Sequence, residues 1–450
     1  MRAMLPRRAA LLGGAGLLLA GCETVTDATD RVLGRSKPPL PGDRRAILAV
    51  TQRLEAEPGA TQRPLTLPPA EPNAAWSQPG GTADHSPGHP ALGPNLVEAW
   101  RAGIGAGTGY RQRLTAPPIV ANGTVFATDA FGRISALDAE RGGRRWSADT
   151  RRRRERDGAM GGAIAVEGGT LYAATGLAEV MALDPATGEI RWRADLPAPA
   201  RGGITVAGGR ILVPTIENHL IACSVENGRE LWRHRAAAVP AIPLGLPGPA
   251  VEGEVVVAGF ASGELVALRL GEGRVIWTES LGNLRGGVLS LTEIGPIVGL
   301  PVIDRGRVFA IGLANSAVSL DLRSGRRIWE REIGGPATPV SVGDWVFALT
   351  GDDELLCLGR DDGRIRWVSR LPSFVDEQRR RNPIAWGPPT LAGGRVLIAG
   401  GHGQLLELDP GTGATLARVR LPGTILAPAI AGSAAFFLTD GGSVVALRGA

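Results

Sequence analysis

The chain has 450 residues, of which 44% are hydrophobic, 21% are charged and 4% are aromatic, and its formal net charge is +5. The hydrophobic fraction argues against an intrinsically disordered chain, and the near balance of 49 basic and 44 acidic residues argues against a nucleic-acid-binding protein. Its 65 glycines and 34 prolines favour many short turns, as in an all-β protein.

The N-terminus has the pattern of a secretory signal peptide. Arg2, Arg7 and Arg8 precede an apolar run from Ala9 to Ala20, which is shorter than the roughly 20 residues that a transmembrane helix needs. We predict that residues 1–21 are removed, which leaves 46 basic and 44 acidic residues. The Arg7-Arg8 pair leaves twin-arginine export open as an alternative to Sec export, although the surrounding residues match that signal poorly.

The end of the apolar run, Leu19-Ala20-Gly21-Cys22, resembles a bacterial lipobox. In that motif the cysteine thiol receives a diacylglyceryl group before cleavage, and each buried methylene of the lipid contributes roughly 0.8 kcal/mol to membrane binding. The sequence therefore predicts lipidation at Cys22. Glu23 follows it, where an enterobacterial sorting rule has aspartate for retention on the inner membrane, and so the outer membrane is favoured. An ordinary cleaved signal with a chance cysteine is the alternative.

From residue 95 onwards the chain repeats a unit of about 44 residues. A glycine stands four residues before a tryptophan in six of these units, at Gly142/Trp146, Gly188/Trp192, Gly228/Trp232, Gly273/Trp277, Gly325/Trp329 and Gly363/Trp367. A seventh glycine, Gly413, is followed by Ala417 instead. Three short apolar segments precede each glycine, and the tryptophan segment is the fourth. Four antiparallel strands in such a period are typical of a propeller blade.

The two ends of the repeat region complete one blade. Residues 427–447 supply three strands, and residues 96–100 supply the missing fourth. We therefore predict an all-β fold, an eight-bladed β-propeller of four-stranded antiparallel blades over residues 95–450, closed by pairing an N-terminal strand with the C-terminal blade. Residues 22–94 are rich in proline and are predicted to form a lipidated, flexible tether.

The pattern Ala182-Leu183-Asp184, followed by Gly188 and Trp192, resembles the PQQ-type repeat that is named from quinoprotein dehydrogenases. This resemblance implies a structural role for the repeat tryptophans, which dock between neighbouring blades: Trp100, Trp146, Trp192, Trp232, Trp277, Trp329 and Trp367.

A lipobox, a proline-rich tether and such a propeller together resemble the BamB family, lipoproteins of the outer-membrane β-barrel assembly machinery. The resemblance implies a non-catalytic scaffold that is anchored in the outer membrane, faces the periplasm and assists the folding and insertion of β-barrel proteins. Its implied partners are the central assembly subunit, a BamA-like protein bound through its periplasmic domains, and nascent outer-membrane proteins. No cofactor and no nucleic acid are implied.

A PQQ-dependent dehydrogenase-like enzyme is the main alternative. Quinoproteins hold their quinone with an adjacent cysteine pair and a calcium ion with acidic and asparagine ligands. This chain has no adjacent cysteines, and Cys223 and Cys357 lie in apolar segments three repeats apart, where we predict buried free thiols. Most acidic residues occupy repeat turns. His85 and His89 are separated by Pro87 and Gly88, which disfavour a metal-binding helix. We therefore predict no catalytic residues and no metal ligands.

Four links between a fourth strand and the next first strand are long, at residues 150–161, 236–248, 282–299 and 372–387. Links of this kind emerge on one rim, and in the BamB family that rim engages the assembly subunit. The matching positions, which we predict to bind the partner, are Ile242, Leu244, Leu246, Glu293 and Ile294. The match is partial, because residues 243–246 contain no arginine.

Two alternatives remain, one for the role of these links and one for the function of the whole propeller. Their apolar groups, including Phe374, Ile384 and Trp386, could instead fold back and cap the ring. A polysaccharide-binding propeller is a third functional class, which the low aromatic content of 4% disfavours.

Overall fold

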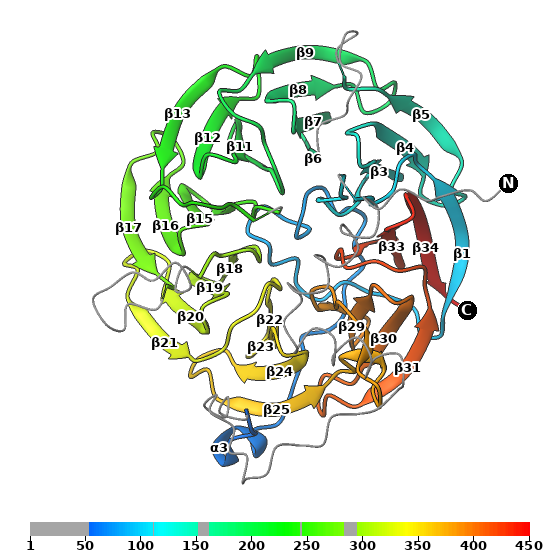
Figure 1. The fold of residues 1–450 in the computed structure, drawn as a ribbon, viewed down its shortest axis with the longest axis vertical. Helices are drawn as coiled ribbons and strands as arrows, with labels where there is room; N and C mark the ends of the chain where they lie inside the picture. The colour runs from blue at the N-terminus through cyan, green and yellow to red at the C-terminus, as the bar shows by residue number, and fades with distance from the viewer. Residues whose placement is uncertain (1–53, 111, 152–161, 244, 283–294) are drawn as a thin grey trace, which may run out of the picture. The chain divides into compact units, whose positions relative to one another are not determined.

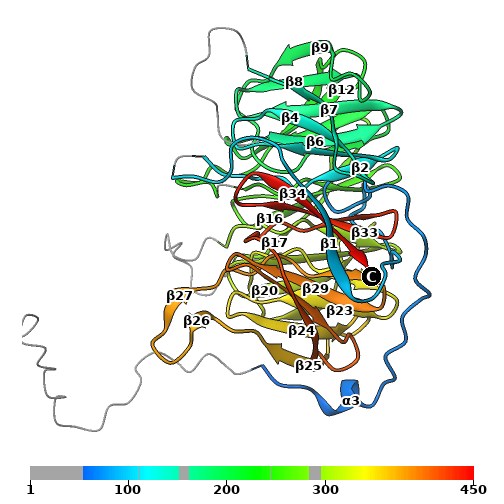
Figure 2. The same cartoon turned by 90° about the vertical axis from the view of Figure 1, so that its right-hand side faces the viewer.

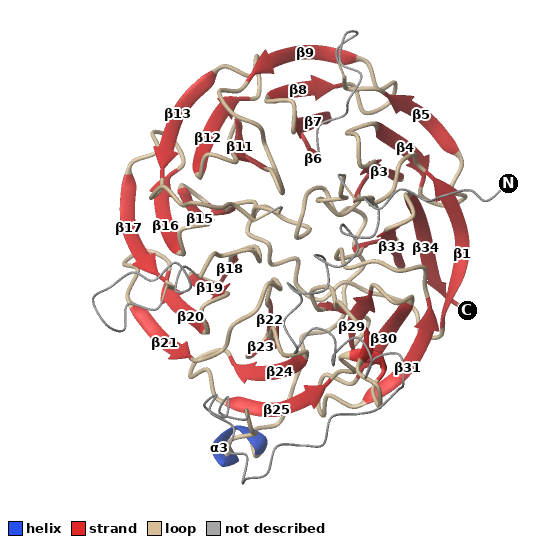
Figure 3. Ribbon diagram, in the orientation of Figure 1, coloured by secondary structure: helices blue, strands red, loops and turns tan. Residues whose placement is uncertain are grey.

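The computed structural model describes residues 54–110, 112–151, 162–243, 245–282 and 295–450 (Figure 1). The predicted signal peptide, Cys22 and the first part of the predicted tether lie outside these ranges, as do Leu244, Glu293 and Ile294. Strands make up nearly all the regular structure that is described, and α3 (Pro58–Thr61) is a single helical turn (Figure 3). No helix in these ranges is long and apolar enough to cross a membrane.

Eight sheets of four antiparallel strands stand around a central axis, and we number these blades in chain order (Figure 1). Blade 1 contains β2 (Ile119–Ala121), β3 (Thr124–Thr128), β4 (Ile134–Asp138) and β5 (Arg144–Ala148). Blade 2 contains β6 (Gly162–Glu167), β7 (Thr170–Thr175), β8 (Glu179–Leu183) and β9 (Ile190–Asp195). Blade 3 contains β10 (Thr205–Ala207), β11 (Arg210–Pro214), β12 (His219–Ser224) and β13 (Glu230–Arg235). Blade 4 contains β14 (Ala250–Glu252), β15 (Val255–Gly259), β16 (Glu264–Arg269) and β17 (Val275–Ser280).

The other half of the ring follows the same plan. Blade 5 contains β18 (Val302–Asp304), β19 (Arg307–Gly312), β20 (Ser316–Asp321) and β21 (Arg327–Arg331). Blade 6 contains β22 (Val340–Val342), β23 (Trp345–Leu349), β24 (Glu354–Gly359) and β25 (Ile365–Arg370). Blade 7 contains β28 (Thr390–Ala392), β29 (Arg395–Gly400), β30 (Gln404–Leu408) and β31 (Thr415–Arg420). Blade 8 contains β32 (Ala429–Ala431), β33 (Ala434–Thr439), β34 (Ser443–Gly449) and β1 (Leu96–Gly103). A hairpin of β26 (Phe374–Asp376) and β27 (Arg381–Pro383) lies in the link between blades 6 and 7.

The predicted ring closure is confirmed. β1 pairs antiparallel with β34, with Trp100 opposite Ala446 and Val97 opposite Arg448. The N-terminal strand thus forms the outer strand of the blade whose other three strands come from the C-terminus. This pairing leaves no incomplete blade, since both ends of the repeat region are held in one sheet.

Burial explains why the inner strands are apolar along their whole length. Each blade packs between two neighbours, so both faces of strands such as β3 and β33 are buried. The outer fourth strands are more exposed, and β31 is exposed at five of its six residues. Cys223 in β12 and Cys357 in β24 are buried free thiols, as predicted. Burial raises the pKa of Cys223 to about 12.

The repeat tryptophans fasten each blade to the next one. Seven of them donate their indole N–H, at 2.8 to 3.2 Å, to a carbonyl in the turn between the third and fourth strands of the following blade. The glycine of that same turn lies under the ring, where a Cβ atom would come within 2.5 to 2.7 Å of the indole. Each tryptophan therefore pairs with the glycine of the next blade, whereas the sequence motif joins it to the glycine of its own.

The structure explains why Ala417 stands where the repeat would place an eighth tryptophan. The blade that follows it is blade 8, in which β34 ends at Gly449 and β1 begins at Leu96. Two chain segments therefore replace the turn that would receive an indole ring. Gly449 instead packs on Gly93, where a Cβ atom on Gly449 would meet the Gly93 Cα atom at 2.7 Å. A tryptophan at position 417 has no glycine turn to pack against.

Residues 54–94 do not form the flexible tether that we expected, because they pack against the ring. We call these residues the strap. It runs from α3, beside blade 6, along one end of the ring and into its centre, as the side view shows (Figure 2). The physical reason is that the innermost strand of each blade has an unpaired edge, and the strap satisfies the backbone groups of that edge.

The strap bonds to the innermost strands of six consecutive blades, from blade 8 to blade 5. In blade 8 the side-chain amide of Asn73 donates to the Ile430 carbonyl at 2.8 Å. Trp76 exchanges two backbone hydrogen bonds with Val120 of blade 1, at 2.7 and 2.8 Å. At the equivalent position of blades 2 to 5, an amide N–H donates to a strap oxygen at 2.7 to 3.0 Å, as follows: Val166 to the Ser77 carbonyl, Val206 to Gln78 Oε1, Val251 to the Ala83 carbonyl and Ile303 to the Asp84 carbonyl. The strap therefore braces the ring from inside.

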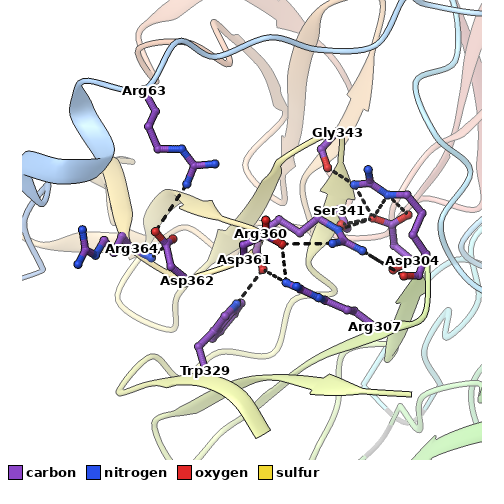
Figure 4. A network of polar contacts seen from close by, with 11 residues as sticks. Arg63, Asp304, Arg307, Trp329, Ser341, Gly343, Arg360, Asp361, Asp362 and Arg364 are labelled. Carbon is purple, nitrogen blue, oxygen red and sulfur yellow. Dashed lines mark hydrogen bonds and ion pairs between the residues drawn. The ribbon is translucent and has the colours of Figure 1, made fainter. Parts of the chain in front are cut away.

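A polar network fastens the start of the strap to blades 5 and 6 (Figure 4). The buried guanidinium of Arg360 in blade 6 donates to Oδ2 of Asp304 in blade 5 at 3.1 Å and to the Asp304 carbonyl at 2.7 Å. The carbonyl of Arg360 in turn accepts the Trp329 indole N–H at 2.9 Å. Arg63 of the strap forms an ion pair with Asp362 at 3.6 Å. The two blades and the strap are thus joined at one place.

Candidate partner-docking face

The two ends of the ring carry different connections. In a four-stranded antiparallel blade successive connections alternate between the two ends, so the turns after the first and third strands share one end. The turn after the second strand and the link to the next blade share the other. We call the first end the strap face, because the strap contacts its turns, as at Gly393 and Asp362. We call the second end the loop face. Figure 2 shows α3 and the β26–β27 hairpin on opposite sides of the ring.

The loop face carries four of the large apolar side chains that are exposed in the described residues. They are Tyr110 between blades 8 and 1, Leu313 in the β19–β20 turn, Val375 in the β26–β27 hairpin and Ile425 between blades 7 and 8. The other exposed large apolar residues, which are Val97, Leu231, Val275, Ile276 and Leu416, belong to outer strands. Apolar groups on exposed loops are typical of a protein interface. Exposure thus favours the loop face over the strap face.

Two of the predicted partner-binding residues, Ile242 and Leu246, lie within the described residues. Ile242 lies in the link between blades 3 and 4 and is partly exposed, and its predicted role stays a prediction. Leu246 is buried and forms a backbone bridge with Gly202. Its side chain is therefore not available to a partner in the isolated chain. Leu246 thus follows the alternative in which apolar groups of the links fold back and cap the ring. Leu244, Glu293 and Ile294 remain predictions outside the described residues.

The link between blades 6 and 7 also contains both buried and exposed apolar residues. Ile384 and Trp386 are buried, and the Trp386 indole N–H donates to the Pro372 carbonyl at 2.8 Å. The hairpin between them and blade 6 carries Val375 at 58% exposure, a residue that the sequence did not single out. This part of the link thus caps the ring with one segment and presents another to solvent.

The tip of this hairpin is basic. Arg379, Arg380 and Arg381 are exposed, and the Arg380 guanidinium lies 5.3 Å from the centre of the Phe374 ring. The nearby carboxylates serve the hairpin itself, since Glu377 accepts the Ser373 and Phe374 amide N–H groups at 2.8 and 3.0 Å. Arg379 forms an ion pair with Asp376 at 3.8 Å. Arg380 and Arg381 therefore offer positive charge to an acidic partner beside the apolar Val375.

Tyr110 shows what the sequence interpretation missed. It is 99% exposed and lies in the link between β1 and β2, residues 104–118, which is not among the four long links predicted from the sequence. It is one of only two tyrosines in the chain, and it follows Gly105, Gly107 and Gly109. A lone aromatic residue in a glycine-rich link is the signal that could have found it.

The acidic side chains that we assigned to repeat turns have that role. Asp138 accepts the Glu140 and Arg141 amide N–H groups at 3.0 and 2.9 Å, and its bond with the Arg145 side chain, together with these amide bonds, lowers its pKa. Asp184, Asp321 and Asp409 accept turn amides in the same manner. Among the described residues, no group of three or more His, Cys, Asp or Glu side chains is arranged to hold a metal ion. The structure thus offers no positive indication of catalysis.

His85 and His89, which we assigned to a flexible tether, are buried in the strap. Nδ1 of His85 lies 2.7 Å from the Pro301 carbonyl oxygen, and Nδ1 of His89 lies 2.7 Å from the Pro68 carbonyl oxygen. A carbonyl can only accept, so each Nδ1 carries a proton. Burial lowers the pKa of His85 to about 4, although the Pro301 carbonyl and the nearby Asp84 carboxylate act in the opposite direction. His85 is therefore neutral at pH 7.

This lowered pKa predicts a loss of stability in acid. Between pH 6.5 and pH 4 the unfolded chain binds a proton at His85 that the folded chain does not, so the free energy of unfolding falls as the pH falls, by about 3 kcal/mol from this residue. The contribution stays constant below pH 4. Urea unfolding at pH 7 and pH 4 should show a smaller loss for His85→Gln, which keeps a donor for Pro301 but does not titrate. Equal losses in both proteins would contradict the prediction.

The fold and its repeat tryptophans define an eight-bladed propeller of the PQQ-repeat class. Matching the sequence to known families assigns residues 130–369 and 373–450 to the family described as "Outer membrane protein assembly factor BamB". The chain therefore belongs to the BamB family, as its resemblance implied.

Individual relatives agree with this assignment. The chain is 25% identical to the BamB protein of Yersinia pestis over 78% of this chain and 88% of that protein. It is 30% identical to the BamB protein of Vibrio cholerae over 69% of this chain and 87% of that protein. The crystal structure of BamB from Moraxella catarrhalis is similar, with a TM-score of 0.66 and 17% identity over 78% of this chain and 99% of that one.

The same fold occurs in enzymes. A europium-containing methanol dehydrogenase has a TM-score of 0.64 and is 14% identical, covering 83% of this chain and 89% of that chain. This likeness shows a shared propeller and nothing more, because propellers of one architecture serve unrelated functions.

Proposed function

We propose that this chain is a non-catalytic docking lipoprotein of the machinery that assembles outer-membrane proteins. The relatives that share its family are named as assembly factors of outer-membrane proteins, which supports the role. A lipid on Cys22 holds the propeller at the outer membrane on the periplasmic side, and the propeller assists the folding and insertion of β-barrel proteins. It acts through binding, since a tethered scaffold raises the local concentration of a partner without new chemistry.

The partner surface is the loop face, where the central assembly subunit docks through its periplasmic domains. The observation that carries this proposal is the distribution of the exposed large apolar residues between the two ends of the ring. Among the described residues, the loop face has four of them and the strap face has none. The basic hairpin tip complements an acidic surface on the partner. Ile242 lies in a link of this face and extends the proposed site. Leu244, Glu293 and Ile294, which are outside the described residues, are proposed as further contacts from the sequence alone.

The structure supplies a matched pair of variants to test the loop face. The loop-face variant carries Leu313→Glu, Val375→Glu and Ile425→Glu, and the outer-wall variant carries Leu231→Glu, Val275→Glu and Ile276→Glu. The leucines are 43% and 41% exposed, the isoleucines 40% and 38%, and the valines 58% and 45%, so the two variants add the same charge at comparable exposure. A charge in an apolar interface is left without water or a partner, which weakens binding strongly.

The measurement is co-purification of the full lipidated chain from membranes in mild detergent, with mass spectrometry of what it retains. We expect the wild type and the outer-wall variant to retain the central assembly subunit, and the loop-face variant to retain about tenfold less, as a loss near 1.4 kcal/mol would give. Equal recovery with both variants would reject the loop face as the docking surface. Failure of the wild type to retain the subunit would reject the assembly role.

A further inference from the structure

The centre of the ring contains a cavity of 410 Å³. Its walls come from seven of the links on the loop face, and strap residues such as Trp76 and His85 complete the lining. Ile425 in the wall is 40% exposed, so the cavity communicates with solvent on the loop face. This volume lies in the range of small-molecule sites, roughly 300 to 1,000 Å³.

Proline and other apolar side chains dominate the lining. Prolines contribute from several links and from the strap, including Pro79, Pro87, Pro117, Pro247 and Pro388. Proline has no N–H and a fixed backbone, so these walls are rigid and poor in donors. A peptide in such a site would bury many backbone groups without partners, which weakens binding. The lining therefore favours a hydrocarbon body over a polypeptide segment.

Two hydroxyl groups of the lining residues are already engaged within the protein. Thr338 Oγ1 accepts the Leu300 amide N–H at 2.9 Å, and Ser341 Oγ donates to Oδ2 of Asp304 at 2.8 Å. These two side chains therefore require no polar group from a ligand.

Arg113 provides the charge of the lining. Among the described residues that line the cavity there is no Asp, Glu or Lys, and His85 is neutral at pH 7. Arg113 is exposed, so its guanidinium lies where solvent also has access. An apolar wall with a single cation complements a ligand that has a hydrocarbon body and one negative charge.

The guanidinium of Arg113 is not neutralised by the protein. It forms no ion pair within 4 Å with any described residue. Its field reaches Asp440, where burial raises the pKa while Arg113 and a hydrogen bond with Thr108 lower it. The Asp440 carboxylate thus bonds to Thr108, and the planar N–H fork of Arg113 remains available for a carboxylate of a ligand.

We propose that this cavity binds an amphiphilic anion, an alkyl carboxylate whose hydrocarbon chain fills the space between the proline-rich links and Trp76 and whose carboxylate pairs with Arg113. The chain buries apolar surface and leaves no polar group unpaired. One guanidinium matches one carboxylate, whereas a cationic head group would be repelled. The proposal is independent of the docking role, because it needs no protein partner.

The test uses three probes that share one alkyl chain and differ in the head group: decanoate, decanol and decyltrimethylammonium. The protein is the full predicted mature chain with Cys22→Ser, which carries no lipid and needs no detergent that would compete with the probes. Calorimetric titration at pH 7 should give a decanoate affinity about tenfold above that of decanol, as expected for a charge-assisted hydrogen bond, and the cation should bind most weakly. Octanoate should bind about fifteenfold more weakly than decanoate, because two buried methylenes are lost.

Three variants locate the two parts of the ligand. Arg113→Gln should lower the decanoate affinity to that of decanol and leave decanol binding unchanged. Arg418→Gln is the matched control, because Arg418 is also exposed but lies on the outer strand β31, and it should change neither affinity. Leu300→Trp fills the cavity and should abolish binding of all the probes.

The outcomes separate the parts of the proposal. Absence of decanoate binding to the chain with Arg113 and Leu300 intact would overturn it. Equal affinity for decanoate and decanol, or a preference for decanoate that survives Arg113→Gln, would overturn the role of Arg113. Binding that survives Leu300→Trp, in a variant whose circular dichroism and unfolding midpoint match the parent chain, would place the probes elsewhere and overturn the site. The docking experiment above can fail without changing any of these results.

Discussion

We expect Trp76→Ala to detach the strap from the ring while the eight blades stay folded. The Trp76 side chain is buried against Gly81, where a Cβ atom would come within 3.1 Å of the indole, and the residue forms two backbone bonds with Val120. Replacing a buried tryptophan with alanine costs about 3 to 5 kcal/mol. Trp76 belongs to the strap and not to a blade, so this loss weakens the binding of the strap before the pairing within the blades.

Amide hydrogen exchange measures the expected detachment directly. The amides of Val166, Val251 and Ile303 donate to strap carbonyls, so their protection should fall by a factor on the order of a hundred or more in the variant. Amides inside the blades, such as that of Phe347 in β23, should keep their protection. Trp386→Ala is the matched control, because Trp386 is also buried but lies on the loop face. If the three amides respond equally to both variants, the strap does not open as a unit.

The second large effect concerns the glycines that receive the tryptophan rings, and blade 4 contains a matched pair. Gly273 has φ of +69° and a Cβ atom there would lie 2.6 Å from the Trp232 ring, whereas Gly253 has φ of +58° and nothing within 4 Å of that position. Alanine at Gly253 should cost about 1 to 2 kcal/mol from its backbone conformation alone. Alanine at Gly273 should cost that amount and roughly 1 to 3 kcal/mol more for the overpacked ring.

Urea unfolding of the two single variants and of Trp232→Ala provides the measurement. Trp232→Ala alone should cost about 3 to 5 kcal/mol, since the ring is buried and its N–H donates to Leu270. Combined with Gly273→Ala, it should cost less than the sum of the two, because the alanine then has no ring to meet. Additive effects of Gly273→Ala and Trp232→Ala, or equal effects of the two glycine variants, would contradict packing of the ring on Gly273.

The candidate docking face could be predicted only in part. Links that join one blade to the next must emerge at one end of the ring, so the sequence predicted that its long loops share one face. It could not predict which apolar residue on that face is exposed. Leu246 and Leu313 are the same residue type on loop-face connections, yet Leu246 folds inward beside Gly202 and Leu313 points to solvent. Only the path of each link decides this difference.

The sequence by itself determined the number of blades, their four strands and the closure of the ring, because turn glycines, apolar strands and tryptophans recur with a fixed period and each blade is built from local hairpins. Only the tertiary structure decided that each tryptophan packs on the glycine of the next blade and that residues 54–94 are bound. The strap has little regular structure of its own, and its hydrogen bonds end on Val166, Val251 and Ile303, far away in the chain. Its order therefore depends on blades that exist only once the ring has closed.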